Sequence, residues 1–238
     1  MIIRNIIQNI LVYIITYIPP LFIYVKFWRR MDRSKLIIII ISVIYMTASV
    51  FTQNLLPFIL VVFNIVYLHR ENEDYERYNF NIKRFKFFKG LKYSFYSYFV
   101  TIVISAITLF VLSNFQIQFK EQEVVTWMVD MPLYKFIFAI PVAVIFAPVL
   151  EEFVFRWFFF ERIFKKRLGI FYSAVLSSII FAAIHYNLRA FPMIFWIGLF
   201  NCYLIERKGY WYAVFNHFVF NSVTIVVLLL QKLNFISM

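Results

Sequence analysis

Two adjacent carboxylates, Glu151 and Glu152, stand within an almost entirely apolar stretch of residues 136–164. A charge near the centre of a bilayer costs at least about 3 kcal/mol, so such a pair needs a partner or a use. Arg156 follows Glu152 by four residues and lies on the same face of a helix, where the two can form an ion pair. Glu151 points elsewhere. We interpret Glu152 and Arg156 as a structural ion pair and Glu151 as the working carboxylate; the alternative is one buried structural network of all three.

Three further polar side chains occur in later apolar runs. His185 ends the sequence Phe-Ala-Ala-Ile-His, and His217 and Asn221 are four residues apart, on one face of another predicted helix. A rise of about 1.5 Å per residue places all of them, with Glu151, near the middle of the membrane. Taken singly, such residues are commonly packed, hydrogen-bonded groups or contacts between helices. Together, at compatible depths on three helices, they indicate a joint functional site.

The residue types narrow the chemistry of this site. The sequence contains no HExxH, which excludes a zincin, and no GxSxG motif to support an acyl-enzyme. A carboxylate and a histidine can activate water, while a second histidine and an asparagine can donate hydrogen bonds to an oxyanion. This combination suits amide hydrolysis. We expect no cofactor; a zinc site formed by Glu151, His185 and His217 is the alternative.

Composition indicates the kind of protein that must position these residues. Of the 238 residues, 63% are hydrophobic, against about 45–50% in soluble domains. The chain is therefore predicted to be an all-α, polytopic membrane protein. Its net charge of +12 does not indicate a nucleic-acid partner, because the cations gather in short loops between apolar runs. Only four glycines occur and none has GxxxG spacing, so we expect no close helix crossing mediated by glycine. We interpret Cys202 as a small apolar filler.

Eight transmembrane helices are predicted in a single membrane domain of residues 1–238, with four spans in residues 1–133 and a motif-bearing core in residues 134–231. Pro19-Pro20 should kink the first span or end its regular part. The loop of residues 69–92 suits either an interfacial segment or an ordinary cytoplasmic loop. The predicted spans are residues 6–25, 36–51, 55–68, 93–112, 134–160, 170–186, 190–205 and 210–230.

The distribution of charge predicts an orientation. Four loops hold 18 of the 24 Lys and Arg residues. By the positive-inside rule these loops face the cytoplasm, and both termini lie outside. We further expect the site in the cytoplasmic half of the bilayer, in a cavity open to the inside. The four loops are residues 26–35, 69–92, 162–168 and 206–209.

At the polar residues of its spans the sequence resembles the CAAX protease and bacteriocin-processing family, also called CPBP or Abi. The family signature is EExxxR, then FxxxH, then HxxxN or HxxxB. In this order the chain has Glu151-Glu152 with Arg156, Phe181 with His185, and His217 with Asn221. The resemblance covers about residues 134–230 and implies an intramembrane endopeptidase with a metal-independent glutamate mechanism. It implies that Glu151 and His185 activate water, and that His217 and Asn221 stabilise the oxyanion.

The resemblance also implies partners, which are a peptide or membrane-protein substrate and the lipid bilayer. Bacterial members are linked to the processing of peptide pheromones or bacteriocins and to self-immunity. The bias toward Ile, Asn, Lys, Phe and Tyr resembles an AT-rich Gram-positive genome, so we expect the plasma membrane of such a bacterium. Two alternatives stay open. One is a non-catalytic immunity or scaffold protein of the same fold; the other is a transporter, which the lack of an inverted repeat disfavours.

Overall fold

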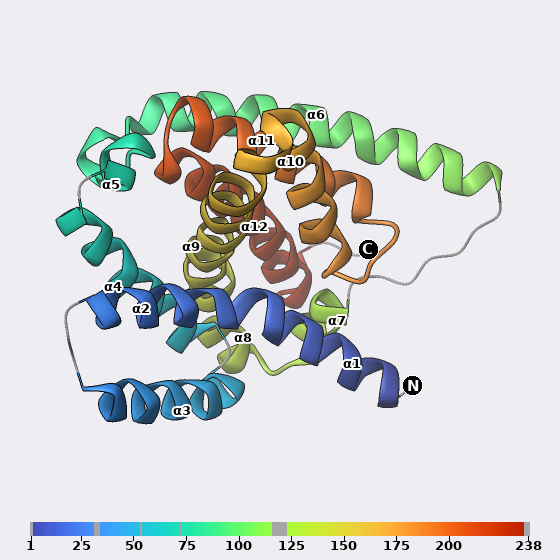
Figure 1. The fold of residues 1–238 in the computed structure, drawn as a ribbon. Coiled ribbons are helices and arrows are strands. Elements are labelled where there is room, and N and C mark those ends of the chain that lie inside the picture. The colour runs from blue at the N-terminus through green and yellow to red at the C-terminus, as the bar shows by residue number, and fades with distance from the viewer. Residues whose placement is uncertain (1, 31–33, 53, 72, 116–122, 236–238) are drawn as a thin grey trace.

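The computed structural model describes residues 2–30, 34–52, 54–71, 73–115 and 123–235. Within these ranges every regular element is a helix, as expected for an all-α fold (Figure 1). The segments are α1 (Ile2–Val12), η1 (Tyr13–Tyr17), α2 (Ile18–Arg30), α3 (Lys35–Thr52), α4 (Leu55–Glu71), α5 (Glu73–Arg77), η2 (Ile82–Arg84), α6 (Phe87–Asn114), α7 (Glu123–Asp130), α8 (Leu133–Pro141), η3 (Val142–Phe146), α9 (Ala147–Glu152), η4 (Phe153–Phe164), α10 (Lys165–Ala183), α11 (Phe191–Arg207) and α12 (Tyr210–Lys232).

Each predicted span corresponds to helical structure, and the protein is a multi-pass membrane protein. Among the described residues, five continuous helices are long and apolar enough to cross a membrane, and α4 is a shorter apolar helix. The longest of the five, Leu133–Ala183, contains two predicted spans. The chain turns between them at Gly169, whose φ of 73° is readily adopted only by glycine.

The first span is not ended by Pro19 and Pro20. Regular α winding stops earlier, at Val12, and the wider π turn η1 leads into α2, which carries both prolines. Because proline has no N–H, two carbonyls of the preceding turn lose their helical donors. The helix accommodates this loss by widening ahead of the prolines. Asn64 of α4 then donates to the Pro20 carbonyl at 2.9 Å, which ties the first and third spans together.

The acidic pair lies on a helix of irregular winding. α9 is only six residues long and is flanked by two π-helical segments, η3 and η4. Such π segments inside longer helices are frequent at functional sites. Here they give the residues around Glu151 and Glu152 an angular spacing that a regular 3.6-residue repeat does not predict.

The main hydrophobic core joins the first four spans to the motif-bearing helices. Ile23 and Val61 from α2 and α4 belong to the same buried cluster as Leu150, Phe155 and Phe181. The segment that carries the acidic pair is therefore held by packing from both parts of the chain. The core fixes its position relative to α10 and α12.

The crossing of α10 and α11 contradicts the expectation that glycine plays no part in close helix packing. A Cβ atom on Gly198 of α11 would lie 2.9 Å from both Cβ and Oγ of Ser178 on α10. That approach is closer than van der Waals contact, so only glycine fits at residue 198. The contact uses one glycine against one serine, and for this reason no GxxxG motif marks it in the sequence.

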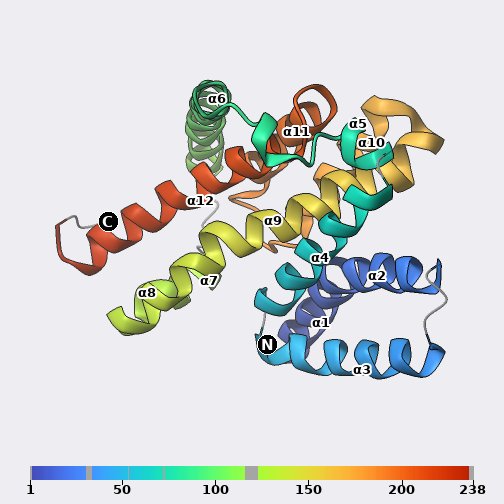
Figure 2. The same ribbon diagram turned by 90° about the vertical axis from the view of Figure 1, so that its left-hand side faces the viewer.

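The two ends of the molecule differ in charge. In Figure 1 and Figure 2 the start of α1 and the end of α12 lie toward one end, with α7, while α5, the end of α2 and the start of α3 lie toward the other. We call these the terminal end and the basic end. The four cationic loops of the sequence belong to the basic end, where Lys165 at the start of α10 pairs with Glu161 at 2.9 Å and with Glu206 near the end of α11.

Candidate active site

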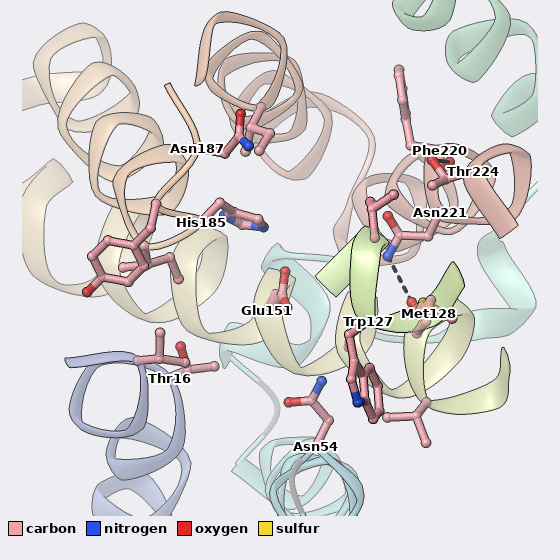
Figure 3. Close-up of a pocket in the computed structure, with 18 of the residues that line it drawn as sticks. Thr16, Asn54, Trp127, Met128, Glu151, His185, Asn187, Phe220, Asn221 and Thr224 are labelled. Carbon is pink, nitrogen blue, oxygen red and sulfur yellow. Dashed lines mark hydrogen bonds between the residues drawn. The ribbon is translucent and has the colours of Figure 1, made fainter. Parts of the chain in front are cut away.

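The four predicted site residues line one cavity of about 1480 Å³. Glu151 reaches it from α9, and His217 and Asn221 from α12. His185 lies in the turn after α10, which ends at Ala183, and not within a span as expected. Figure 3 shows Glu151 between His185 on one side and Asn221 on the other. The structure therefore brings together the residues that the three sequence motifs contribute.

Glu151 and His217 face each other across part of this cavity. The Oε2 atom of Glu151 is 3.8 Å from Nε2 of His217, and the Glu151 side chain is 18% exposed. This separation is too long for a direct hydrogen bond. It allows a single water molecule to bind both groups. Glu151 is thus a carboxylate with access to the cavity and a histidine within bridging distance.

Glu152 lies behind Glu151 and is completely buried. Its Oε2 is 3.1 Å from Nε of Arg156, so the predicted ion pair is present, with no exposed surface on either side chain. Its Oε1 is 2.8 Å from Nδ1 of His217. Because a carboxylate only accepts, Nδ1 of His217 donates, and this bond turns Nε2 toward Glu151. The ion pair and the cavity residues are therefore one connected network, in which only Glu151 and His217 line the cavity.

His185 has the complementary arrangement. Its Nδ1 donates to the Phe181 carbonyl at 2.7 Å, one helical turn earlier, which leaves Nε2 as an acceptor. The Phe181 ring lies edge-on to both imidazoles, with centroids 4.9 Å from His185 and 5.8 Å from His217. The guanidinium carbon of Arg156 lies 4.1 Å from the centre of the same ring. Phe181 thus separates the two histidines and covers the buried cation.

Asn221 is partly used in joining two helices. Its Nδ2 donates to the Ala143 carbonyl at 2.8 Å, the contact drawn in Figure 3. The backbone N–H of Ala147 donates to the carbonyl of Val142, five residues earlier and not the usual four. With the same spacing, the donor to the Ala143 carbonyl would be residue 148. That residue is Pro148, which has no N–H. Asn221 therefore satisfies a carbonyl that the helix cannot, and its amide has a second N–H for the cavity.

The metal alternative is not supported by a ready ligand set. In the part of the chain that the structure describes, no three His, Cys, Asp or Glu side chains are grouped so that they could hold a metal ion. Glu151, His185 and His217 share the cavity but are not arranged as such a group.

One wall of the cavity, which faces Glu151 from the first four spans, was not predicted from the sequence. This wall is polar, and Tyr17 donates to Oδ1 of Asn54 at 2.9 Å within it. Gln8, Val12 and Thr16 are spaced four residues apart, so the polar side chains of Gln8 and Thr16 lie on one face of the first span. This spacing was the available signal for a polar wall. The polar residues of this wall are Gln8, Asn9, Thr16, Tyr17 and Asn54.

The cavity opens at the terminal end, so the expectation of a cavity open toward the basic loops is wrong. Among its lining residues, Trp127, Phe138 and Leu188 are well exposed there. At the basic end a group of buried aromatic side chains, which we call the aromatic plug, closes the bundle. The aromatic plug consists of Phe80, Phe153, Trp157, Phe160 and Tyr210, each at most 2% exposed.

The position of Phe80 explains why the bundle is closed at the basic end. The loop of residues 69–92 neither stays in solution nor lies along the interface throughout, because its middle docks on the start of α12. Tyr210 donates its backbone N–H to the Tyr78 carbonyl at 2.8 Å, and Nε1 of Trp211 donates to the Phe80 carbonyl at 2.6 Å. These bonds hold the Phe80 ring in the core, with its centre 4.6 Å from that of Tyr210.

The motif-bearing segment matches a known family. Residues 133–223 match the sequence model described as "Type II CAAX prenyl endopeptidase Rce1-like". This match covers less than half of the chain and shows that the segment is similar to the CAAX protease family. The matched range holds all six residues predicted for the catalytic site and its ion pair. The family therefore accounts for the helices that build the site.

A curated relative supports the same family. The chain is 28% identical over 97 residues to the "Putative membrane peptidase YdiL" of Bacillus subtilis (strain 168), a match that covers 40% of this chain. The match spans only 39% of the length of that relative. No solved structure matches the chain significantly.

Proposed function

We propose that this protein is an intramembrane endopeptidase that hydrolyses a peptide bond with water activated by Glu151. The observation that carries the proposal is the 3.8 Å approach of Glu151 to His217 in a cavity that His185 and Asn221 also line. The family of the motif-bearing segment supports a membrane peptidase. The geometry supports the division of roles between the four side chains.

In the proposed reaction Glu151 takes a proton from a water molecule, and the resulting hydroxide attacks the carbonyl carbon of the scissile bond. His185 accepts a hydrogen bond from the same water at Nε2, since its Nδ1–H is engaged by Phe181. The carbonyl oxygen becomes an oxyanion, to which Nε2–H of His217 and an N–H of Asn221 donate. Glu151 then returns the proton to the leaving nitrogen as the C–N bond breaks.

Glu152 and Arg156 act through His217 and are positioning residues. For His217 to donate from Nε2 while Nδ1 also donates to Glu152, its imidazole must carry both protons. The buried carboxylate of Glu152 stabilises that cation and fixes the direction of the ring. Arg156 offsets the buried charge of Glu152.

The proposed substrate is a peptide or a membrane-bound protein, and the proposed setting is peptide processing or self-immunity in a Gram-positive plasma membrane. The Bacillus relative and the residue bias of the sequence support this setting. The mechanism needs no metal, so activity should survive a chelator. Loss of activity on chelation, restored by zinc, would contradict this part of the proposal.

The test uses purified protein in liposomes with a library of internally quenched peptides. The wild type should cleave a subset of the library, and Glu151→Gln and His185→Ala should not. Glu76→Gln is the matched control, because Glu76 pairs with Arg84 on the exposed surface of the basic end. Equal turnover by all four proteins would end the proposal. Full biological activity of Glu151→Gln in cells would favour the non-catalytic alternative.

A further inference from the structure

We infer that the cavity opens to the extracytoplasmic face of the membrane, so that a substrate must be carried across the membrane before it is cleaved. The second half of this inference rests on the proposed function; the first half does not. Three observations support an extracytoplasmic opening: the elements that line the cavity, the distribution of charge along the molecule, and the side chains that close the basic end.

The lining of the cavity comes from the terminal end of the bundle. Its walls are the first span up to Tyr17, the turn at Asn54, α7, the segment from α8 to α9, the end of α10 with the turn after it, the first half of α11, and α12 from His217 onward. These segments lie together at the end where both termini emerge (Figure 1 and Figure 2). Lys232, at the end of α12, donates to the carbonyls of Val129 and Met131 beside α7, which fixes this grouping.

The charges place that end outside the cell. The connections at the basic end hold 18 of the 24 Lys and Arg residues, and the connections and termini at the other end hold five. Short cytoplasmic connections carry an excess of Lys and Arg, and this bias sets the orientation of a membrane protein. An inverted orientation would require 18 cationic residues on the extracytoplasmic side.

The aromatic plug removes a second entrance. Between Glu151 and the basic end, the ring centres of Phe153 and Trp157 lie 4.6 Å apart, and both side chains are fully buried. Phe80 completes the layer, with its ring centre 6.0 Å from that of Trp157. A smaller cavity of about 270 Å³ at the basic end reaches Trp157, but it shares no lining residue with the cavity of Glu151. A peptide in the cytoplasm therefore meets the aromatic plug, whereas one at the terminal end meets the open side of the cavity.

The mouth of the cavity indicates which segment enters. Trp127 and Phe138 offer apolar, exposed surface, while Gln8 and Asn9 offer amides. This pairing suits an extended peptide with an apolar portion in the lipid and a polar backbone in the cavity. The reaction that supplies the substrate is then protein or peptide translocation, and cleavage follows it.

The test measures which side of the membrane reaches the cavity, with single cysteines and a membrane-impermeant maleimide added to intact cells. Leu188→Cys and Thr224→Cys, which are both exposed and both line the cavity, report on its open side. Lys166→Cys, exposed at the basic end, is the matched control. The wild-type chain is the background, because its only cysteine, Cys202, is buried.

We expect label on the first two variants in intact cells, and label on Lys166→Cys only after the membrane is permeabilised. Label on Lys166→Cys in intact cells, with none on the other two, would overturn the inference. The same pattern is expected with Glu151→Gln added, because labelling needs no hydrolysis.

Sealed vesicles test the second half of the inference. A quenched peptide that the purified enzyme cleaves should be cleaved by right-side-out vesicles and not by inside-out vesicles. Cleavage confined to inside-out vesicles would contradict extracytoplasmic delivery. If the chain is labelled from outside but cleaves no peptide in any preparation, the proposed function is contradicted. The labelling would still support an opening on the extracytoplasmic side.

Discussion

At the scale of single residues, Glu152 links the parts of the site. It holds His217 at 2.8 Å and Arg156 at 3.1 Å, and none of its side chain is exposed. A buried carboxylate that holds a histidine and an arginine is costly to disturb, because each partner left alone is an uncompensated buried group. Removal of the Glu152 carboxylate should therefore affect stability through Arg156 and catalysis through His217.

We predict that Glu152→Gln lowers the free energy of unfolding by about 3–5 kcal/mol, since it leaves the Arg156 charge unpaired. Activity should fall as well, because His217 loses the carboxylate that fixes the direction of its ring. Adding Arg156→Met should restore much of the stability and none of the activity. Thermal unfolding and peptide cleavage of the three proteins check this; recovery of both properties in the double variant would mean that Glu152 has no role in positioning His217.

Asn221 allows its structural and chemical roles to be separated. Asn221→Ala should cost about 1–3 kcal/mol, because the Ala143 carbonyl is left without a donor. In a Pro148→Ala background, residue 148 has an N–H that can reach this carbonyl, so the cost should shrink. Activity should stay low in both backgrounds if Asn221 donates to the oxyanion. If Asn221→Ala regained both activity and stability in the Pro148→Ala background, the bond from Asn221 to the Ala143 carbonyl would be the whole contribution of Asn221.

At the scale of elements, the sequence predicted the helices well and their local winding poorly. Apolar runs and cationic loops located the helices, because burial in lipid demands long apolar helices. The π segments around Glu151 were not predictable from a regular periodicity. Nor was the bond between Asn221 and Ala143, since it depends on where Pro148 falls in a widened turn. His185 was placed on a helix because nothing in the sequence after Ala183 marks the turn.

The α10–α11 crossing depends on Gly198 and Ser178. We predict that Gly198→Ala lowers the free energy of unfolding by about 1–3 kcal/mol, as overpacking of a tight contact does. Ser178→Gly removes the two atoms that lie 2.9 Å from the new Cβ, so the double variant should recover most of the loss. Chemical denaturation in detergent measures these changes. Additive losses in the double variant would show that the two positions do not oppose each other.

At the scale of the whole molecule, charge predicted an orientation but not the position of the cavity. The cations of residues 69–92 gave this loop a cytoplasmic location by a rule that concerns charge alone. The same loop contributes Phe80 to the core, a contact that depends on hydrogen bonds to residues 210 and 211, far along the chain. The sequence therefore predicted four residues that line one cavity, and it placed the opening of that cavity at the other end of the bundle.

We predict that Phe80→Ala costs about 3–5 kcal/mol, as the truncation of a buried ring does. It should also admit a maleimide from the basic end, so that Thr224→Cys becomes reactive from both faces of sealed vesicles. Phe88→Ala is the matched control, because Phe88 lies in the same loop region and is 82% exposed. Unchanged one-sided labelling of a folded Phe80→Ala chain would show that other side chains close the basic end.

The central claim is that Glu151 activates water for peptide hydrolysis, and the most direct measurement is the initial cleavage rate of one quenched peptide by Glu151→Gln and by wild type. Both proteins are compared in the same liposomes after their melting temperatures are shown to agree. We predict that the variant is slower by about 100-fold to 10,000-fold, the usual contribution of a positioned general base. A folded Glu151→Gln protein that cleaves at the wild-type rate would contradict the account.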